Sequence, residues 1–223
     1  MERFKEGIAQ RLTARHKKAL ALCRVKDKRI LDVGCSFGWF EKLAKEKGCR
    51  EVIGLDPDKK ILQLAKKQVK GVKFIKGSAT NLPFGRNRFD LVVMFDTLEH
   101  LPKNLENKAF FEIKRVLKKN GEIVFSFPSN HFLAKILDPA WYFGHRHYSL
   151  EQVFQFLTKK GFEIKKVEKG GGFFEILSMI LLYIFKWIFK REMPFKNFLE
   201  RKREKEYFEN GGFVTTYILG KRK

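Results

Sequence analysis

Short apolar runs alternate with segments of helical spacing through the first half of the chain. The apolar runs at 29–34, 51–56, 72–75 and 89–95 are typical of strands, and helical spacing follows them at about 39–47, 59–69 and 104–118. Asp58 is a suitable N-cap for the second of these helices, and Gly48 is a suitable stop for the first. Because connections between parallel strands are right-handed crossovers, this order predicts a parallel sheet covered by helices.

The second half continues the pattern and then interrupts it. Asn120-Gly121 predicts a turn into a strand at 122–127, Ser149 and Gln152 form a capping box for a helix, and a sixth strand is expected at 162–167. The β-branched and aromatic run at 213–219 predicts a last strand. About 45 residues separate these two strands. An insertion of this size is usually functional.

The segment ILDVGCSFGWF, Ile30 to Phe40, is predicted to form a strand, a tight turn and the start of a helix. A dinucleotide-binding turn has glycines at its first, third and sixth positions, which here are Gly34, Ser36 and Trp39. A tryptophan at the third glycine position would obstruct close packing of the helix against the strand. The turn therefore does not favour NAD or FAD.

The remaining pattern, Asp32-x-Gly34-x-Ser36-x-Gly38, resembles the first signature of class I S-adenosylmethionine (SAM) dependent methyltransferases, with serine at the middle glycine. Companion segments follow in the family's order at 51–58, 74–84, 88–101 and 111–127, so the resemblance covers roughly residues 28 to 130. Within the family, these segments resemble the type 11 branch, whose acceptors are small molecules or lipids. The resemblance implies an α/β fold with a Rossmann-like, mostly parallel sheet of seven strands in the order 3-2-1-4-5-7-6. Helices on both faces, an antiparallel last strand and a helical insertion between strands six and seven complete this expectation.

The same resemblance implies where SAM binds. The backbone of the glycine turn receives the methionine carboxylate, Asp32 lies near the amino group and Asp56 binds the ribose. Ser78 stands where the family often has an aspartate for the adenine, and Phe95 lies in the wall beside the sulfonium. The expected cofactor-binding set is Asp32, Gly34, Cys35, Ser36, Gly38, Asp56, Pro57, Ser78, Ala79, Phe95 and Asp96.

Methyl transfer from a sulfonium is an in-line displacement that mainly requires alignment in a dry site, so no catalytic residue is strictly needed. The candidate proton acceptors are His100, His145, His147 and Tyr148. The alternative for His100 is a structural role, as a hydrogen-bonded histidine without a part in catalysis. The loop that contains the other three residues either lines the acceptor pocket or only packs on the next helix. Asp96, Glu99 and His100 resemble an acidic-histidine stretch credited with a divalent ion in quinone-precursor O-methyltransferases. Without a second clustered set of ligands, no metal is expected.

The length of 223 residues, with 44% hydrophobic content and no linker rich in Pro, Gly or Ser, predicts one domain over 1–223. Its expected parts are an N-terminal helix in 1–27, the SAM-binding core in 28–130, an acceptor-side segment in 131–170, the insertion in 171–211 and the last strand in 212–223. The N-terminal helix has Phe4, Ile8, Leu12 and Leu20 on one side, and it either packs on the sheet edge or brings Arg15 or His16 to the cofactor. Three cysteines and a charged start without an apolar run indicate a cytoplasmic protein.

The charge is strongly positive, with 47 Lys and Arg against 25 Asp and Glu, a net charge of +22. Such a surface attracts nucleic acid or anionic lipid. The tetrapeptide typical of base-amino methylation, Asn/Asp-Pro-Pro-Tyr/Phe, is absent after strand four, where residues 96–99 read Asp-Thr-Leu-Glu. A small-molecule or lipid-linked acceptor is therefore favoured, with an RNA methyltransferase and a non-catalytic SAM-binding scaffold as alternatives. The intact acidic and glycine positions of the signature count against the scaffold.

The most apolar stretch, 173–189, is short for a membrane span and contains Glu175 and Lys186. On a helix, these two residues share a narrow stripe with Ser178 and Lys190, and the rest forms one wide apolar face. That face includes Phe174, Ile176, Ile180, Tyr183, Ile184 and Trp187. Basic residues follow, so the insertion is expected to lie on the inner face of an anionic membrane beside a lipid-linked acceptor. A lid over the acceptor pocket and a dimer contact remain as alternatives, and the oligomeric state is left open.

Overall fold

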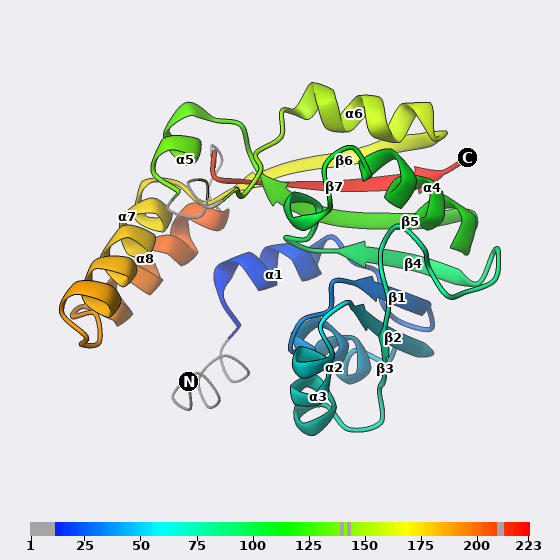
Figure 1. The fold of residues 1–223 in the computed structure, drawn as a ribbon, viewed down its shortest axis with the longest axis horizontal. Helices are drawn as coiled ribbons and strands as arrows, with labels where there is room; N and C mark the ends of the chain where they lie inside the picture. The colour runs from blue at the N-terminus through cyan, green and yellow to red at the C-terminus, as the bar shows by residue number, and fades with distance from the viewer. Residues whose placement is uncertain (1–11, 139–140, 142–143, 209–211) are drawn as a thin grey trace.

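The computed structural model describes residues 12–138, 141, 144–208 and 212–223, which form a single sheet with helices on both faces (Figure 1). The strands are β1 (Arg29–Val33), β2 (Glu51–Asp56), β3 (Lys73–Lys76), β4 (Phe89–Met94), β5 (Leu117–Pro128), β6 (Phe162–Gly170) and β7 (Thr215–Arg222). The α-helices are α1 (Ala14–Ala21), α2 (Trp39–Glu46), α3 (Lys59–Gln68), α4 (Glu106–Val116), α5 (Phe132–Ile136), α6 (Leu150–Lys159), α7 (Phe173–Tyr183) and α8 (Lys196–Phe208). A 3-10 turn, η2 (Leu98–His100), follows β4, and a π-helical segment, η4 (Ile184–Ile188), extends α7.

The strand order is β3-β2-β1-β4-β5-β7-β6. Neighbouring strands from β3 to β5 pair in parallel, whereas β7 is antiparallel to both β5 and β6. The order reverses between β1 and β4, so the carboxyl ends of these two strands open a crevice at the edge of the sheet. The predicted fold class is confirmed.

Each face of the sheet has its own apolar core. The helices α4 and α6 cover one face through a cluster that includes Phe110, Ile113 and Leu157. The opposite face is covered by α1 and α2, with Ala19 and Phe40 among the buried residues, and by α3 nearer the sheet edge. Because β1 and β4 contribute to both cores, they are buried on both sides, as their continuous apolar sequence predicts.

Most element boundaries lie within two residues of the prediction, but β5 begins five residues early. Two steps along β4, from Phe89 to Leu91, correspond to five along β5, from Leu117 to Glu122. The predicted turn at Asn120-Gly121 is therefore a bulge inside the strand, with φ of 63° at Asn120. The sequence pattern of a turn and of a bulge is the same here, since both need a residue with positive φ.

The structure also differs from the prediction in the segment after β5 and in the N-terminal helix. The segment after β5 contains the short helix α5, which the sequence pattern did not predict. In the N-terminal segment, α1 begins at Ala14, and the predicted contacts of Phe4 and Ile8 lie outside the described residues. Leu12 is 37% exposed, so it does not join the core, whereas Ala14 and Ala19 do.

The insertion between β6 and β7 is helical, as predicted, and forms a hairpin of α7, η4 and α8 that projects from the sheet (Figure 1). Glu206 of α8 accepts hydrogen bonds from the backbone N–H groups of Gly172, Phe174 and Glu175, which are unpaired at the start of any helix. The Glu175 carboxylate in turn accepts from Arg203 at 2.5 Å. The polar stripe of α7 therefore begins against α8, and Glu175 and Ser178 are buried. Among the described residues, no helix has the length and apolar character needed to cross a bilayer.

Candidate active site

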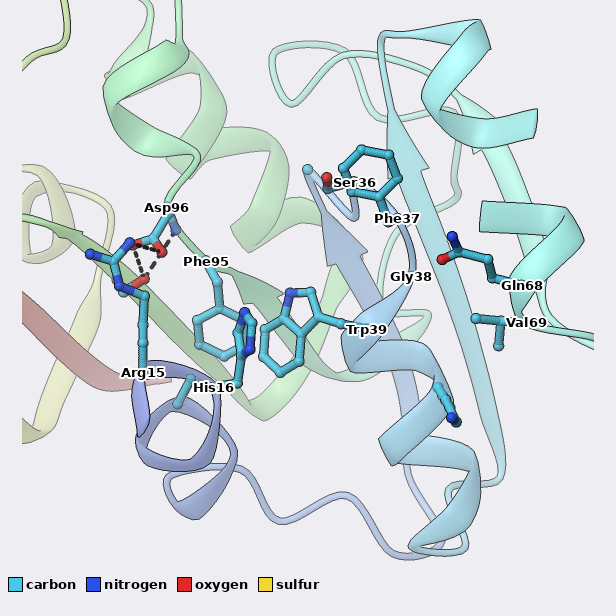
Figure 2. Close-up of a pocket in the computed structure, with 14 residues that line it drawn as sticks. Arg15, His16, Ser36, Phe37, Gly38, Trp39, Gln68, Val69, Phe95 and Asp96 are labelled. Atoms are coloured by element: carbon cyan, nitrogen blue, oxygen red, sulfur yellow. Dashed lines mark hydrogen bonds and ion pairs between the residues drawn. The ribbon is translucent and has the colours of Figure 1, made fainter. Parts of the chain in front are cut away.

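A cavity of about 320 Å³ lies between α1, the β1–α2 turn, the end of α3 and the carboxyl end of β4 (Figure 2). Five of the residues predicted to bind the cofactor line it: Gly34, Ser36, Gly38, Phe95 and Asp96. The cavity therefore occupies the crevice where ligands bind in open α/β sheets.

The β1–α2 turn needs glycine for both conformation and space. Gly34 and Gly38 each have φ of 83°, and the Gly34 N–H donates to the Leu55 carbonyl at 2.7 Å. A Cβ at position 34 would lie 2.2 Å from Oγ1 of Thr97. The turn ends at the N-terminus of α2, where backbone N–H groups lack partners within the helix and can receive an anion such as a carboxylate.

Asp56 holds the turn from the neighbouring strand. Its Oδ2 accepts from the Ser36 N–H at 3.1 Å, and its Oδ1 accepts from the Asp58 N–H at 2.9 Å. The side chain is buried, and these two hydrogen bonds stabilise the conformation of the turn. Its predicted contact with the ribose stays a prediction.

Two further carboxyl groups are buried beneath the turn. Asp32 is 2% exposed, and Glu41, from the first turn of α2, is fully buried with hydrogen-bond partners for neither oxygen among the described residues. Burial, reinforced by the Asp56 charge, raises the pKa of Asp32 well above its usual value. Burial and the neighbouring Asp32 likewise raise the pKa of Glu41. The sequence pattern identified Asp32 but missed Glu41, because a glutamate in the first turn of a helix is ordinarily a solvent-exposed residue.

Arg15 fixes the opposite wall of the cavity (Figure 2). Its Nη1 donates to Oδ2 of Asp96 at 2.9 Å, and its other nitrogens donate to Tyr207 and Thr215 at 3.3 Å each. Ser126 completes the arrangement, since its hydroxyl donates to Oδ1 of Asp96 at 2.8 Å. Both carboxylate oxygens of Asp96 are therefore held in place at the cavity.

An aromatic wall lies beside this ion pair. Trp39 stacks on His16 with ring centroids 4.2 Å apart and contacts Phe95 at 5.6 Å. Burial and the adjacent Arg15 charge lower the pKa of His16 to about 4, so its imidazole is neutral at pH 7. Arg15 and His16, the two N-terminal residues predicted as possible cofactor ligands, both line the cavity. Trp39 was considered only as an obstacle to dinucleotide binding, although its place directly after Gly38 could have indicated the wall.

The other predicted cofactor residues lie around the cavity and do not line it. Cys35 is buried in the turn, and Ser78 is exposed, with its hydroxyl 2.9 Å from that of Thr80. Pro57 follows Asp56, and Ala79 follows Ser78. Their contacts with a cofactor stay predictions.

Residues 31–125 match the family model described as a methyltransferase domain. This segment contains the end of β1, the glycine turn, Asp56 and the end of β4, and the turn and the end of β4 line the cavity. Residues 31–125 are a class I SAM-dependent methyltransferase domain. The family and fold predicted from the motifs are confirmed, and the cofactor of this domain is SAM.

The chain is also similar to curated methyltransferases over about half of its length. The chain is 32% identical over 113 residues to the ubiquinone/menaquinone biosynthesis C-methyltransferase of Campylobacter jejuni, a match that covers 48% of this chain and 47% of the relative. It is 38% identical over 106 residues to the demethylmenaquinone methyltransferase of a Geobacillus strain, with 44% of each chain covered. The chain thus spans about half the length of the curated relatives it matches.

Solved structures extend the likeness of fold beyond the methyltransferase domain. A SAM-dependent methyltransferase from Mesorhizobium loti superposes with a TM-score of 0.66 at 20% identity, covering 94% of this chain and 98% of that one. At this identity the likeness shows the fold alone.

The four predicted proton acceptors lie apart from the lining of the methyltransferase cavity. His100 is exposed, and its ring lies 4.9 Å from that of His145, beside a second cavity that follows η2. His147 and Tyr148 are turned toward the protein, where the Tyr148 hydroxyl donates to the Leu98 carbonyl at 3.3 Å and to Glu106 at 3.1 Å. Burial and Glu106 raise the pKa of Tyr148, so its proton is firmly held. The catalytic role of these four residues stays a prediction.

The space at Gly34 can be tested against a matched glycine. Gly34 and Gly48 have φ of 83° and 76°, but only Gly34 has a neighbour within 4 Å of the missing Cβ. Both Gly34→Ala and Gly48→Ala introduce backbone strain of about 1–2 kcal/mol. We expect Gly48→Ala to bind SAM like the parent protein and Gly34→Ala to lose at least about tenfold in affinity by calorimetry, because the turn must move away from Thr97. Equal affinities would contradict the assigned role of the turn.

Glu41 makes stability depend on pH. Because its pKa is raised in the folded protein, the folded state keeps a proton that the unfolded state releases above about pH 4.5. Stability therefore falls as pH rises from there toward the folded pKa, by about 1.4 kcal/mol for each pH unit in that window. Glu41→Gln removes this loss. The difference in the free energy of unfolding between the variant and the parent protein, measured in urea, should therefore favour the variant more at pH 8 than at pH 5. A difference in the free energy of unfolding that does not change with pH would show that Glu41 is ionised in the folded protein.

Proposed function

We propose that the protein transfers the methyl group of SAM to a small apolar or lipid-linked acceptor of the quinone-precursor type, at the surface of a membrane. The observation that carries the proposal is the cavity at the glycine turn in a methyltransferase domain similar to quinone-biosynthesis enzymes. The RNA alternative rests on charge alone.

The cavity has the parts that methyl transfer needs. The turn and the N-terminus of α2 provide backbone donors for a carboxylate. Phe95 and Trp39 present aromatic rings, which attract a sulfonium by the cation–π effect. Asp96 is held by Arg15 and Ser126 at the same wall. SAM supplies the activated methyl group, and these residues hold it in a water-poor site where an acceptor can align.

The helical hairpin supports a membrane location for the acceptor. Its tip carries exposed apolar side chains, with Ile188 70%, Phe189 55% and Phe195 80% exposed. An apolar groove of about 540 Å³ lies between the end of α7 and the start of α8 and includes Phe185 and Phe198. On the same side of the molecule, α5 exposes Phe132 by 71% (Figure 1). Exposed apolar surface of this kind is typical of an interaction site.

Charge at the tip selects an anionic bilayer as the proposed partner. The exposed basic residues of this region include Lys190, Arg191, Lys196, Arg201 and Lys202. Apolar side chains that enter the acyl boundary next to basic side chains at the headgroups are the make-up of an interfacial anchor. The proposal therefore places the protein in the cytoplasm, attached peripherally to the inner face of the membrane.

The acceptor class can be tested by label transfer. The protein is incubated with SAM carrying a radioactive methyl group and with separated lipid, small-metabolite and RNA fractions, and Gly34→Ala serves as the variant with a disrupted SAM site. We expect label in the lipid fraction with the parent protein and at least about tenfold less with the variant. Label in RNA would favour the RNA alternative, and no label in any fraction would favour the scaffold.

Membrane attachment needs a variant that leaves the hairpin folded, because its base contains the buried residues Glu175 and Tyr207. The double variant Ile188→Ser/Phe195→Ser changes only exposed side chains at the tip. Phe111→Ser is the matched control, since Phe111 is 50% exposed on α4. Burial of a large apolar side chain contributes about 1.5–3 kcal/mol.

We therefore expect the double variant to co-sediment with anionic liposomes at least about tenfold more weakly than the parent protein, and the control to bind like the parent. Neutral liposomes should bind all three weakly. Equal binding of the double variant and the parent to anionic liposomes would exclude the tip as the membrane contact and leave a lid or a dimer contact as its role.

A further inference from the structure

Two histidines and an aspartate converge in the loop that follows β5, apart from the SAM cavity. One oxygen of Asp138, Oδ2, lies 3.1 Å from Nδ1 of His145 and 3.1 Å from Nε2 of His147. The three groups each offer a ligand atom within 4.8 Å of the others. They are spread over ten residues of loop, so the fold and not a helical repeat brings them together.

The orientation of His147 is set by its other ring nitrogen. Nδ1 of His147 lies 2.7 Å from the Ser129 carbonyl oxygen, and a carbonyl can only accept a hydrogen bond, so Nδ1 carries the proton. In the neutral ring, Nε2 then presents its lone pair to Oδ2 of Asp138. Two lone pairs facing each other at 3.1 Å repel unless a proton or a metal ion lies between them. A backbone carbonyl that fixes the tautomer in this way is the usual outer partner of a metal-binding histidine.

A second carboxylate faces the same group of residues. Oε1 of Glu99 lies 3.7 Å from Nε2 of His145, on the other side of the ring from Asp138. Glu99 is 3% exposed, and its Oε2 has no hydrogen-bond partner among the described residues. Two buried carboxyl groups therefore flank one imidazole, one at each ring nitrogen.

We propose that Asp138, His145 and His147 bind a divalent transition-metal ion of the zinc, iron or manganese class. Ligand atoms of a tetrahedral ion at about 2.0–2.1 Å lie about 3.3 Å apart, close to the two observed separations of 3.1 Å. A donor set of two imidazoles and one carboxylate favours these ions over magnesium or calcium, which prefer oxygen ligands.

The neighbouring cavity provides room for a further ligand. It measures about 460 Å³ and is lined by His145 together with Glu99 and His100. An ion with three protein ligands and one open position can hold water or an oxygen of a small molecule. No metal was expected from the sequence because a second clustered set of ligands was not visible there. The loop supplies that set.

Metal binding can be measured on the full chain without SAM or an acceptor, so its failure is independent of the proposed function. Chelator-treated protein is titrated with Zn²⁺ by calorimetry, with Mg²⁺ as the control ion. The ligand variants are Asp138→Asn and His147→Gln, and His131→Gln is the matched control because His131 is exposed and belongs to neither cluster. We expect the ligand variants to bind Zn²⁺ at least about 100-fold more weakly, since even outer partners contribute 10–100-fold. The control should bind like the parent protein.

Cobalt gives a readout that does not depend on the variants folding. Co²⁺ added to the unchanged protein should produce the visible absorption bands of a four- or five-coordinate site, and Zn²⁺ should displace them. The absence of both Zn²⁺ binding and Co²⁺ bands would overturn the proposal and leave a protonated His147 paired with Asp138. Loss of binding in His100→Gln, with binding retained in Asp138→Asn and His147→Gln, would also overturn it, because the ion would then lie between Glu99 and His100.

Discussion

The close approach of the β1–α2 turn to the end of β4 is the constraint on which the site depends. Thr97 occupies the space that any side chain at position 34 would need, and the Leu55 carbonyl holds the Gly34 N–H from the other side. With the backbone fixed between two strands, the N-terminus of α2 points into the crevice and Trp39 forms its wall. The shape of the cavity therefore follows from the absence of a Cβ at one residue.

A partly buried guanidinium connects this crevice to the rest of the molecule. Arg15 contacts Asp96 at the end of β4, Thr215 in β7 and Tyr207 in α8, and it lies 3.6 Å from Glu175 in α7. A charge that loses part of its contact with water is more stable where it is paired and hydrogen-bonded, so these contacts favour keeping the four partners together. The base of the hairpin is thereby tied to the wall of the SAM cavity, and a shift of α7 and α8 would change the position of Asp96.

The sequence predicted the parts of this structure that have a local cause. Hydrophobic periodicity located the strands up to β4, the Asp58 cap and the Ser149 capping box were visible in a few residues, and the order of the strands followed from the resemblance. Contacts between distant segments were out of reach. Arg15 and Thr215 are 200 positions apart. Trp39 forms a wall of the cavity because Phe95 and His16 lie beside it, and the sequence does not show these contacts. The bulge in β5 was mistaken for a turn because both use the same residues.

The hairpin shows how a polar stripe can turn toward the protein. An isolated helix with the sequence of α7 would expose Glu175 to water. In the hairpin, Arg203 of α8 donates to Glu175, and Glu206 of α8 caps N–H groups at the start of α7. Turning the stripe inward satisfies these charges and leaves much of the last turn of α7 and the following segment exposed, including Leu182 at 49% and Ile188 at 70%. Apolar exposure on this scale costs free energy in water, at about 25 cal/mol for each Å². Contact of the tip with another apolar phase would remove this cost, which is the role proposed for it, while the charged base keeps its partners within the protein.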